Sequence, residues 1–288
     1  MLSIILILLF VFSVLSVPVC QGVISGLYLF GLKVFPGLFI SFIVTNVLVR
    51  VIEYKKINNP LILVAAGLMT GFPNGAYICA WYHKNNPESR LADMLAGIIN
   101  IPSPAFLISY VYINILEKCI DIYTFLIITY LPVIICSVVI IALYKDKAQD
   151  NVKGVNKVNK GLMLCFFEKA VDSAINTALK LGAYIILFSV IVNLVIYLIP
   201  DNMAGLVVAY PLEISNGLAI IKNSALAADV FILMTVLLDA FGGVCIIMQT
   251  RCVCNQYISI KKYIYQKLVL CIVTLAMTYL LIYVLNIL

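Results

Sequence analysis

The chain alternates long apolar runs with short polar or basic stretches, and most runs reach the roughly 20 residues that an α-helix needs to cross a bilayer. We predict spans over residues 2–19, 25–49, 91–116, 122–144, 179–199, 226–250 and 267–288. Two further apolar segments, 60–83 and 203–225, are interrupted by residues that helices tolerate poorly. The pattern predicts an all-α polytopic membrane protein.

The first interrupted segment contains Gly71-Phe72-Pro73-Asn74-Gly75, and the second contains the run from Tyr210 to Gly217. In hydrocarbon, every backbone N–H and C=O needs an internal partner. A broken helix is therefore tolerated only where protein surrounds it or where it lines a polar cavity. Breaks at corresponding places in two halves of a chain indicate the substrate site of a secondary transporter.

The composition excludes a soluble globular domain, because only 11% of the residues are charged against about 25% in such domains. Nine cysteines lie without ligand-like spacing, and the chain has one histidine, His83. We therefore expect neither a metal site nor a cofactor. The run over residues 2–19 lacks a basic start and is longer than the apolar part of a signal peptide, so we expect a retained first helix.

Most Lys and Arg residues fall in four stretches, 50–56, 84–90, 145–169 and 251–267. The positive-inside rule places these stretches in the cytoplasm. Segment 60–83 must then enter and leave from the cytoplasmic side, and segment 203–225 from the opposite side. Both are predicted to be re-entrant hairpins.

The two halves repeat the same order of span, hairpin, interrupted span and span. Lys33 matches Lys180, Asn74-Gly75 matches Asn216-Gly217, and residues 100–104 match 239–243. We predict an N-terminal half over 1–144, a cytoplasmic linker and interfacial helix over 145–178, and a C-terminal half over 179–288. Opposite hairpin sides make this an inverted repeat. The alternative is chance similarity among apolar segments.

A helix that begins inside the membrane presents free N–H groups and the positive end of its dipole. Breaks at 71–75, 102–104, 215–217 and 242–243 would supply up to four such ends, and glycine would let an anion approach closely. The alternative is that these residues only permit kinks or tight packing. The expected substrate-binding residues are Gly71, Pro73, Asn74, Gly75, Asn100, Ser103, Pro104, Glu213, Ser215, Asn216, Gly217, Gly242 and Gly243.

Charges inside membrane segments are rare and usually functional. Lys33, Lys180 and Asp239 are the charge or coupling candidates. A lysine would attract an anionic substrate, while Asp239 or Glu213 would carry the coupling ion, H⁺ or Na⁺. A buried ion pair that only fixes packing is the equal alternative.

Four motifs occur in order along most of the chain. They are Gly71-Phe72-Pro73-Asn74-Gly75-Ala76, Asn100-x-Pro-Ser-Pro-x-Phe106, Leu212-Glu213-Ile214-Ser215-Asn216-Gly217, and Ala240-Phe241-Gly242-Gly243 with Gln249. Together they resemble the sporulation integral membrane proteins with a nucleoside-recognition gate domain, above all the stage V sporulation dipicolinate transporters. The family more often has Tyr-Pro-Thr-Gly-Ala-Lys at the first hairpin, whereas Phe72, Asn74 and Tyr77 stand here.

The resemblance implies a fold similar to that of concentrative nucleoside transporters. It also implies movement of dipicolinic acid, a small aromatic dianion, into the developing forespore across the outer forespore membrane. The expected partners are this anion and the lipid bilayer, without nucleic acid. Two alternatives stay open: a nucleoside or related heteroaromatic transporter, and a non-transporting membrane assembly protein of the spore envelope. An enzyme is not expected, because neither a Ser/His pair nor a His-Glu-x-x-His motif occurs.

Overall fold

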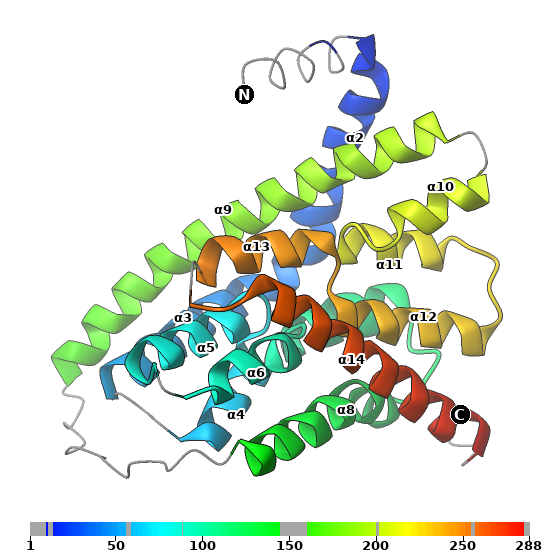
Figure 1. The fold of residues 1–288 in the computed structure, drawn as a ribbon. Helices are drawn as coiled ribbons and strands as arrows, with labels where there is room; N and C mark the ends of the chain where they lie inside the picture. Colours follow the sequence, from blue (N-terminus) through cyan, green and yellow to red (C-terminus); the bar gives the residue numbers. More distant parts are fainter. Residues whose placement is uncertain are drawn as a thin grey trace.

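The computed structural model describes residues 10, 14–55, 59–87, 89–144, 160–199, 202–254 and 257–284. Every regular element in these ranges is a helix (Figure 1). Within the same ranges, six helices are long and apolar enough to cross a membrane: Ser16–Lys55, Leu91–Ile115, Ile122–Leu143, Cys165–Leu198, Ala228–Cys254 and Ile260–Ile282. The prediction of a multi-span helical membrane protein is therefore confirmed.

The elements follow the same order in both halves: a long helix, two short helices joined by a turn, a broken helix and a last helix. The first half comprises α2 (Ser16–Tyr28), η1 (Leu29–Val34), α3 (Phe35–Lys55), α4 (Pro60–Thr70), α5 (Asn74–Asn85), α6 (Leu91–Ile99), α7 (Pro104–Phe106), η2 (Leu107–Ile115) and α8 (Ile122–Leu143). The second comprises α9 (Lys160–Leu198), α10 (Asn202–Ala209), α11 (Ile214–Lys222), α12 (Ala228–Phe241), α13 (Val244–Cys254), α14 (Ile260–Tyr279) and η3 (Leu280–Val284).

Each half begins with a helix much longer than the predicted spans 25–49 and 179–199. The elements α2, η1 and α3 form one continuous helix of 40 residues, so the expected boundary between spans 2–19 and 25–49 is wrong. The one glycine at this boundary, Gly22, lies within the helix and packs against the backbone of Val190 in α9. Most of the predicted span 2–19 lies outside the described residues.

Helix α9 spans 39 residues and continues through residues 178 and 179, where we expected an interfacial helix to give way to a span. No proline interrupts this stretch, so nothing in the local sequence ends the helix. Both α2 and α3 pack along α9 (Figure 1). The predicted linker residues 145–159 and the end of the last predicted span, 285–288, lie outside the described residues.

The segment η1 is a π-helix that ends two residues before Pro36. Proline has no N–H and its ring displaces the carbonyl one turn earlier, so a locally widened helix accommodates it. Lys33 lies in this segment. Such π-helical insertions are frequent at functional sites.

The short helices are separated by four breaks, at residues 71–73, 100–103, 210–213 and 242–243. Gly71 and Gly242 have positive φ angles of 68° and 83°, which favour glycine. The third break lies one turn before the place we predicted, because Ser215, Asn216 and Gly217 form the start of α11.

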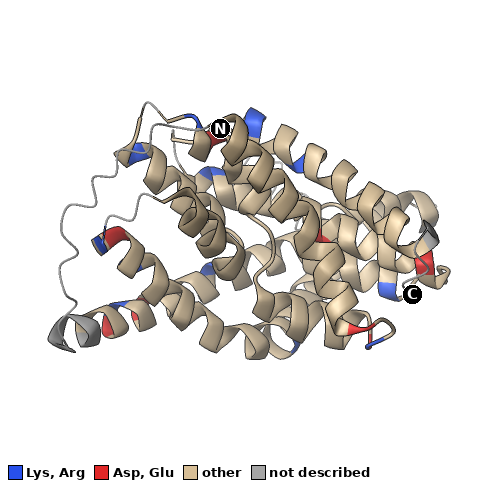
Figure 2. Ribbon diagram, turned by 90° about the horizontal axis from the view of Figure 1, so that it is seen from below, with Lys and Arg blue, Asp and Glu red and all other residues tan. Residues whose placement is uncertain are grey.

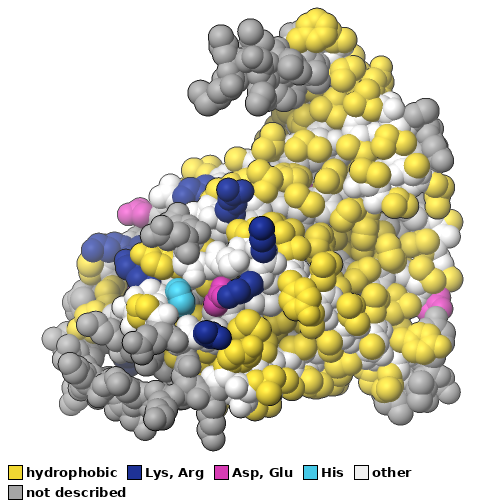
Figure 3. Space-filling view, in the orientation of Figure 1, with side chains coloured by type: hydrophobic (Ala, Val, Ile, Leu, Met, Phe, Trp, Pro, Cys, Tyr) yellow, Lys and Arg dark blue, Asp and Glu magenta, His cyan; other side chains and the backbone are white. Residues whose placement is uncertain are grey.

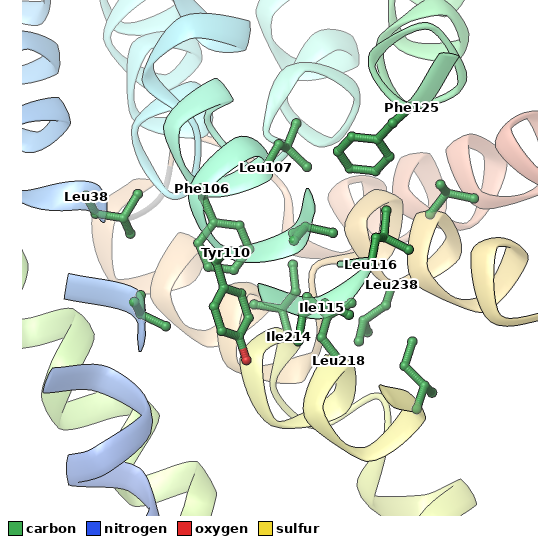
Figure 4. Packing of buried hydrophobic residues seen from close by; sticks show 14 of the residues in the cluster. Leu38, Phe106, Leu107, Tyr110, Ile115, Leu116, Phe125, Ile214, Leu218 and Leu238 are labelled. Carbon is green, nitrogen blue, oxygen red and sulfur yellow. The ribbon is translucent and has the colours of Figure 1, made fainter. Parts of the chain in front are cut away.

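The largest apolar cluster joins the two halves. Figure 4 shows Ile115 and Leu116 of the first half beside Leu218 and Leu238 of the second. Outside this core, large apolar side chains cover most of the face shown in Figure 3. Ile40, for example, is 66% exposed. This apolar exterior is what contact with lipid requires.

Charged residues gather toward the ends of the molecule, with few between (Figure 2). Contacts tie the basic stretches together: Arg50 donates to the Lys169 carbonyl at 3.0 Å, and Lys84 lies 6.0 Å from the Tyr257 ring centroid. These contacts agree with the expectation that the basic stretches share one side of the membrane.

Candidate functional site

The turns and helix breaks of both halves meet in the middle of the molecule. A Cβ atom on Gly71 would lie 2.4 Å from the Ser103 nitrogen, and one on Gly243 would lie 3.3 Å from the Glu213 Cα atom. In each half, therefore, the turn between the short helices touches the break of the broken helix. Phe72 also packs against Gly242 and so connects the two halves.

Asn100 is fully buried and connects four helices. Its Oδ1 atom accepts from the Ala76 N–H of α5 at 3.2 Å. Its Nδ2 atom donates to Tyr263 at 2.8 Å and to Thr250 at 3.3 Å. Both Nδ2 hydrogens are thus used within the protein, and the Oδ1 atom of Asn100 orients the start of α5.

A second polar group surrounds the start of α11. The Glu213 carboxylate accepts from the backbone N–H and the Nδ2 of Asn216, both at 2.8 Å. The Asn216 amide also contacts the Ser189 hydroxyl of α9 at 3.0 Å. The Tyr110 hydroxyl donates to the Ser215 carbonyl at 2.9 Å. This network is the physical reason that α11 begins at Ile214, since Glu213 caps the helix.

The four helix starts that we expected to bind an anion already use some of their N–H groups. The Val244 and Cys245 N–H groups of α13 donate to the carbonyls of the 210–213 turn, each at 2.9 Å. In α7, the Phe106 N–H donates to Ser103 at 3.4 Å. The α5 and α11 starts bond to Asn100 and Glu213, as described above. A bound anion would therefore depend on side-chain charges more than on the backbone.

Three cavities adjoin this central region. The α5 cavity, about 340 Å³, is lined by Phe42, Phe72, Pro73, Asn74, Thr177, Lys180, Leu181, Tyr184, Gln249, Cys252 and Val253. The α11 cavity, about 540 Å³, is lined by Gln21, Ile24, Ser25, Tyr28, Leu29, Lys33, Tyr110, Asn114, Ile115, Asn216, Ala219, Lys222 and Asn223. The central cavity, about 40 Å³, is lined by Val34, Leu38, Ser41, Phe42, Thr70, Phe72, Pro102, Ser103, Phe106, Leu181, Ile185, Glu213, Ile214, Ser215 and Ile246.

The order of lining residues along the long helices places the central cavity between the other two. Along the first helix, Lys33 lines the α11 cavity, Val34 lines the central cavity and Phe42 lines both the central and α5 cavities. Along α9, Lys180 lines the α5 cavity and Ile185 the central cavity. The large cavities thus lie on opposite sides of a narrow middle.

The predicted lysines lie in corresponding positions in this arrangement. Lys33 lines the α11 cavity with Asn216, and Lys180 lines the α5 cavity with Asn74. Asp239 lies elsewhere, fully buried in α12, and its carboxyl oxygens have no hydrogen-bond partner among the described residues. The two salt bridges found in the described ranges are Lys222–Glu117 and Lys262–Asp93. Neither predicted lysine is paired with Asp239.

Four further predicted site residues lie at helix starts or permit close packing of the backbone. Pro73 is the N-cap of α5, and Pro104 is the first residue of α7. Gly75 and Gly217 lie inside helices, where a Cβ atom would meet Asn100 at 3.0 Å and the Tyr210 carbonyl at 2.3 Å. The two glycines permit close packing within the protein.

Sequence reasoning missed Lys267, which we assigned to a cytoplasmic basic stretch. Lys267 lies two turns inside α14 and is 0% exposed. Its Nζ atom donates to the carbonyls of Asn100 and Ala240. The helical spacing of Tyr263, Lys267 and Leu270, all buried, is a signal that could have placed it on an inner face.

Comparisons of the chain with protein-family models, curated proteins and solved structures returned no match.

Proposed function

We propose that this protein carries a small aromatic dicarboxylate, dipicolinic acid, across the membrane through the three cavities. The observation that carries the proposal is the repeated pair of a lysine and an asparagine in the two large cavities. Ammonium groups attract a dianion, and amides orient its carboxylates by hydrogen bonds. Volumes of about 340 and 540 Å³ fall in the range of small-molecule sites.

The order of elements supports an inverted repeat with two re-entrant hairpins, α4–α5 and α10–α11. In this arrangement each hairpin reaches the middle from a different side, and each presents its asparagine to a different cavity. Rocking of one repeat against the other is the usual way in which such proteins alternate access.

The central cavity must open for transport. Its volume of about 40 Å³ is close to the roughly 30 Å³ that one water molecule occupies, so the described structure is closed there. Phe42, Phe72 and Leu181 line both the central and the α5 cavities. Movement of these side chains would join the two spaces.

A nucleoside or related neutral heteroaromatic solute is the second candidate. Glu213 lines the central cavity and is 2% exposed. A carboxylate repels a dianion but accepts hydrogen bonds from hydroxyl and amino groups. The charge of the permeating solute therefore separates the two candidates.

Uptake of labelled dipicolinate into vesicles that contain the purified protein tests the proposal. We expect Lys33→Gln and Lys180→Gln to weaken dipicolinate uptake about fivefold or more and to leave uptake of the neutral pyridine-2,6-dicarboxamide unchanged. Lys261→Gln is the matched control, because Lys261 is exposed and lines none of the three cavities. Uptake of nucleosides but not dipicolinate, abolished by Glu213→Gln, would favour the second candidate.

The coupling ion and the cellular location are parts of the same proposal. If Asp239 carries a proton, wild-type uptake depends on pH and uptake by Asp239→Asn does not. Localisation to the outer forespore membrane, on the mother-cell side, is tested by imaging a fluorescent fusion in sporulating cells. Absence of uptake of either solute by well-folded protein would favour an assembly role in the spore envelope.

A further inference from the structure

Lys267 lies beside the C-terminal ends of α6 and α12, the first parts of the two broken helices. It donates to the carbonyl of Asn100, which caps the C-terminus of α6, and at 3.0 Å to that of Ala240, in the last turn of α12. Carbonyls at a helix C-terminus lack intrahelical partners and carry the negative end of the dipole. Two such ends from different halves thus share one ammonium group.

The remaining side of the ammonium faces an aromatic ring. The Lys267 Nζ atom lies 5.0 Å from the centroid of Phe72 and 5.8 Å from that of Tyr263, both within the distance of a cation–π interaction. Phe72 belongs to the turn between α4 and α5 and also lines the central cavity. The ammonium therefore contacts three parts of the site: the C-terminal ends of α6 and α12 and the Phe72 ring.

We propose that the Lys267 ammonium is a resident cation, which occupies a position that would otherwise bind an inorganic monovalent cation. Paired helix C-termini inside membrane proteins coordinate Na⁺ through their carbonyl oxygens. Here a covalently attached cation supplies the same charge to the same kind of oxygen. The position needs no ion from solution, and in the described structure the ammonium joins α6 to α12.

If the Lys267 side chain only filled space, its replacement by methionine would leave the stability unchanged. Methionine has a similar length and no charge. However, methionine cannot donate to the carbonyls of Asn100 and Ala240, and each buried group left unpaired costs about 1–3 kcal/mol. The melting temperature therefore separates the role of the charge from that of the bulk without any substrate. The role of the ammonium does not depend on which solute the protein carries.

Thermal unfolding of purified Lys267→Ala in detergent, in chloride salts of Na⁺, K⁺, NH₄⁺ or choline, tests the proposal. We expect the variant in choline to melt about 5 °C or more below wild type. A small cation that enters the vacated space should restore at least half of that loss, whereas choline is too large to enter. Lys261→Ala, on the exposed side of the same helix, should show neither the loss nor the restoration.

A folded Lys267→Ala protein whose melting temperature is the same in all four salts would overturn the proposal. If Lys267→Ala does not fold in any salt, Lys267→Met decides the question. Melting of Lys267→Met within about 1 °C of wild type would show that bulk alone matters, and a loss of about 5 °C or more would support the ammonium role. Because melting needs no dipicolinate, failure of this test is separate from failure of the transport proposal.

Discussion

The buried amide of Asn100 illustrates how a polar residue in an apolar protein is stabilised by its partners. Its side chain bonds to Ala76, Tyr263 and Thr250, and its carbonyl accepts from Lys267. Replacement by alanine would leave several of these groups unpaired in the buried interior.

We therefore expect Asn100→Ala to lower the stability by about 2–4 kcal/mol, since each unsatisfied buried group costs about 1–3 kcal/mol. The measurement is the melting temperature of purified protein in detergent. Asn85→Ala is the control, because that asparagine is exposed and its side chain donates to the Trp81 carbonyl of the same helix. Equal melting of the two variants would contradict the central role of Asn100.

At the scale of the elements, helix boundaries with a local cause could be predicted from the sequence, and those with a tertiary cause could not. The breaks near Pro73 and Gly242 follow from residues that cannot continue a helix, so the sequence alone located them. The start of α11 depends on the capping carboxylate of Glu213, and the first helix packs along α9 over much of its length. These causes act between residues that a single-sequence pattern does not bring together.

The burial of Lys267 was missed for a related reason. The positive-inside rule counts charges near the ends of spans and does not say where a helix starts. Helix α14 begins at Ile260, with Ser259 as its N-cap, so a lysine from the basic stretch lies inside the span. In the candidate site, Lys33 shares a cavity with Asn216 and Lys180 shares one with Asn74. These are the residues that the sequence comparison of the two halves matched with each other.

The packing of α11 depends on a glycine. A Cβ atom on Gly217 would lie 2.3 Å from the Tyr210 carbonyl oxygen and 2.5 Å from Leu238. Gly217→Ala should therefore displace α11 from the preceding turn and cost about 1–3 kcal/mol, measured as a lower melting temperature and weaker uptake. Gly31→Ala is the matched control, because a Cβ atom there has no neighbour within 4 Å. Tolerance of Gly217→Ala would mean that α11 is free to shift.

The far end of α11 is held by an ion pair that responds to pH. The hydrogen bond and charge of Lys222 lower the pKa of Glu117 below its ordinary value of 4.5. A lowered pKa in the folded state means that the pair stabilises above the ordinary pKa and is lost as the pH falls through the folded-state value. Melting of wild type and Glu117→Gln should differ slightly at pH 6 and converge near pH 3. A difference that grows on acidification would have the wrong sign.

At the scale of the whole molecule, the α5 cavity contains a natural chemical probe. Cys252 is exposed and lines this cavity together with Lys180. In a background that retains Cys252 and replaces the other exposed or partly exposed thiols, Cys20, Cys119, Cys136 and Cys165, an anionic methanethiosulfonate reagent should react severalfold faster than a cationic one.

Dipicolinate should slow this reaction, and Lys180→Gln should remove the preference for the anionic reagent. The same reaction in sealed vesicles of known orientation reports which side the α5 cavity faces, and we expect the cytoplasmic side. Faster reaction with the cationic reagent would contradict an anion-attracting cavity.

The two long helices also set how the protein meets its bilayer. The apolar helix Cys165–Leu198 has 34 residues, or about 51 Å at 1.5 Å per residue, against a hydrocarbon core of about 30 Å. Such a helix accommodates its excess length by tilting or by extending past the hydrocarbon, and so does its packing partner Ser16–Lys55, with 40 residues. A thicker bilayer favours more upright helices, and uprighting either one changes their crossing angle beside the central cavity. If the protein transports as proposed, the rate of transport should therefore change with lipid chain length, because membrane thickness is mechanically coupled to the packing around the central cavity.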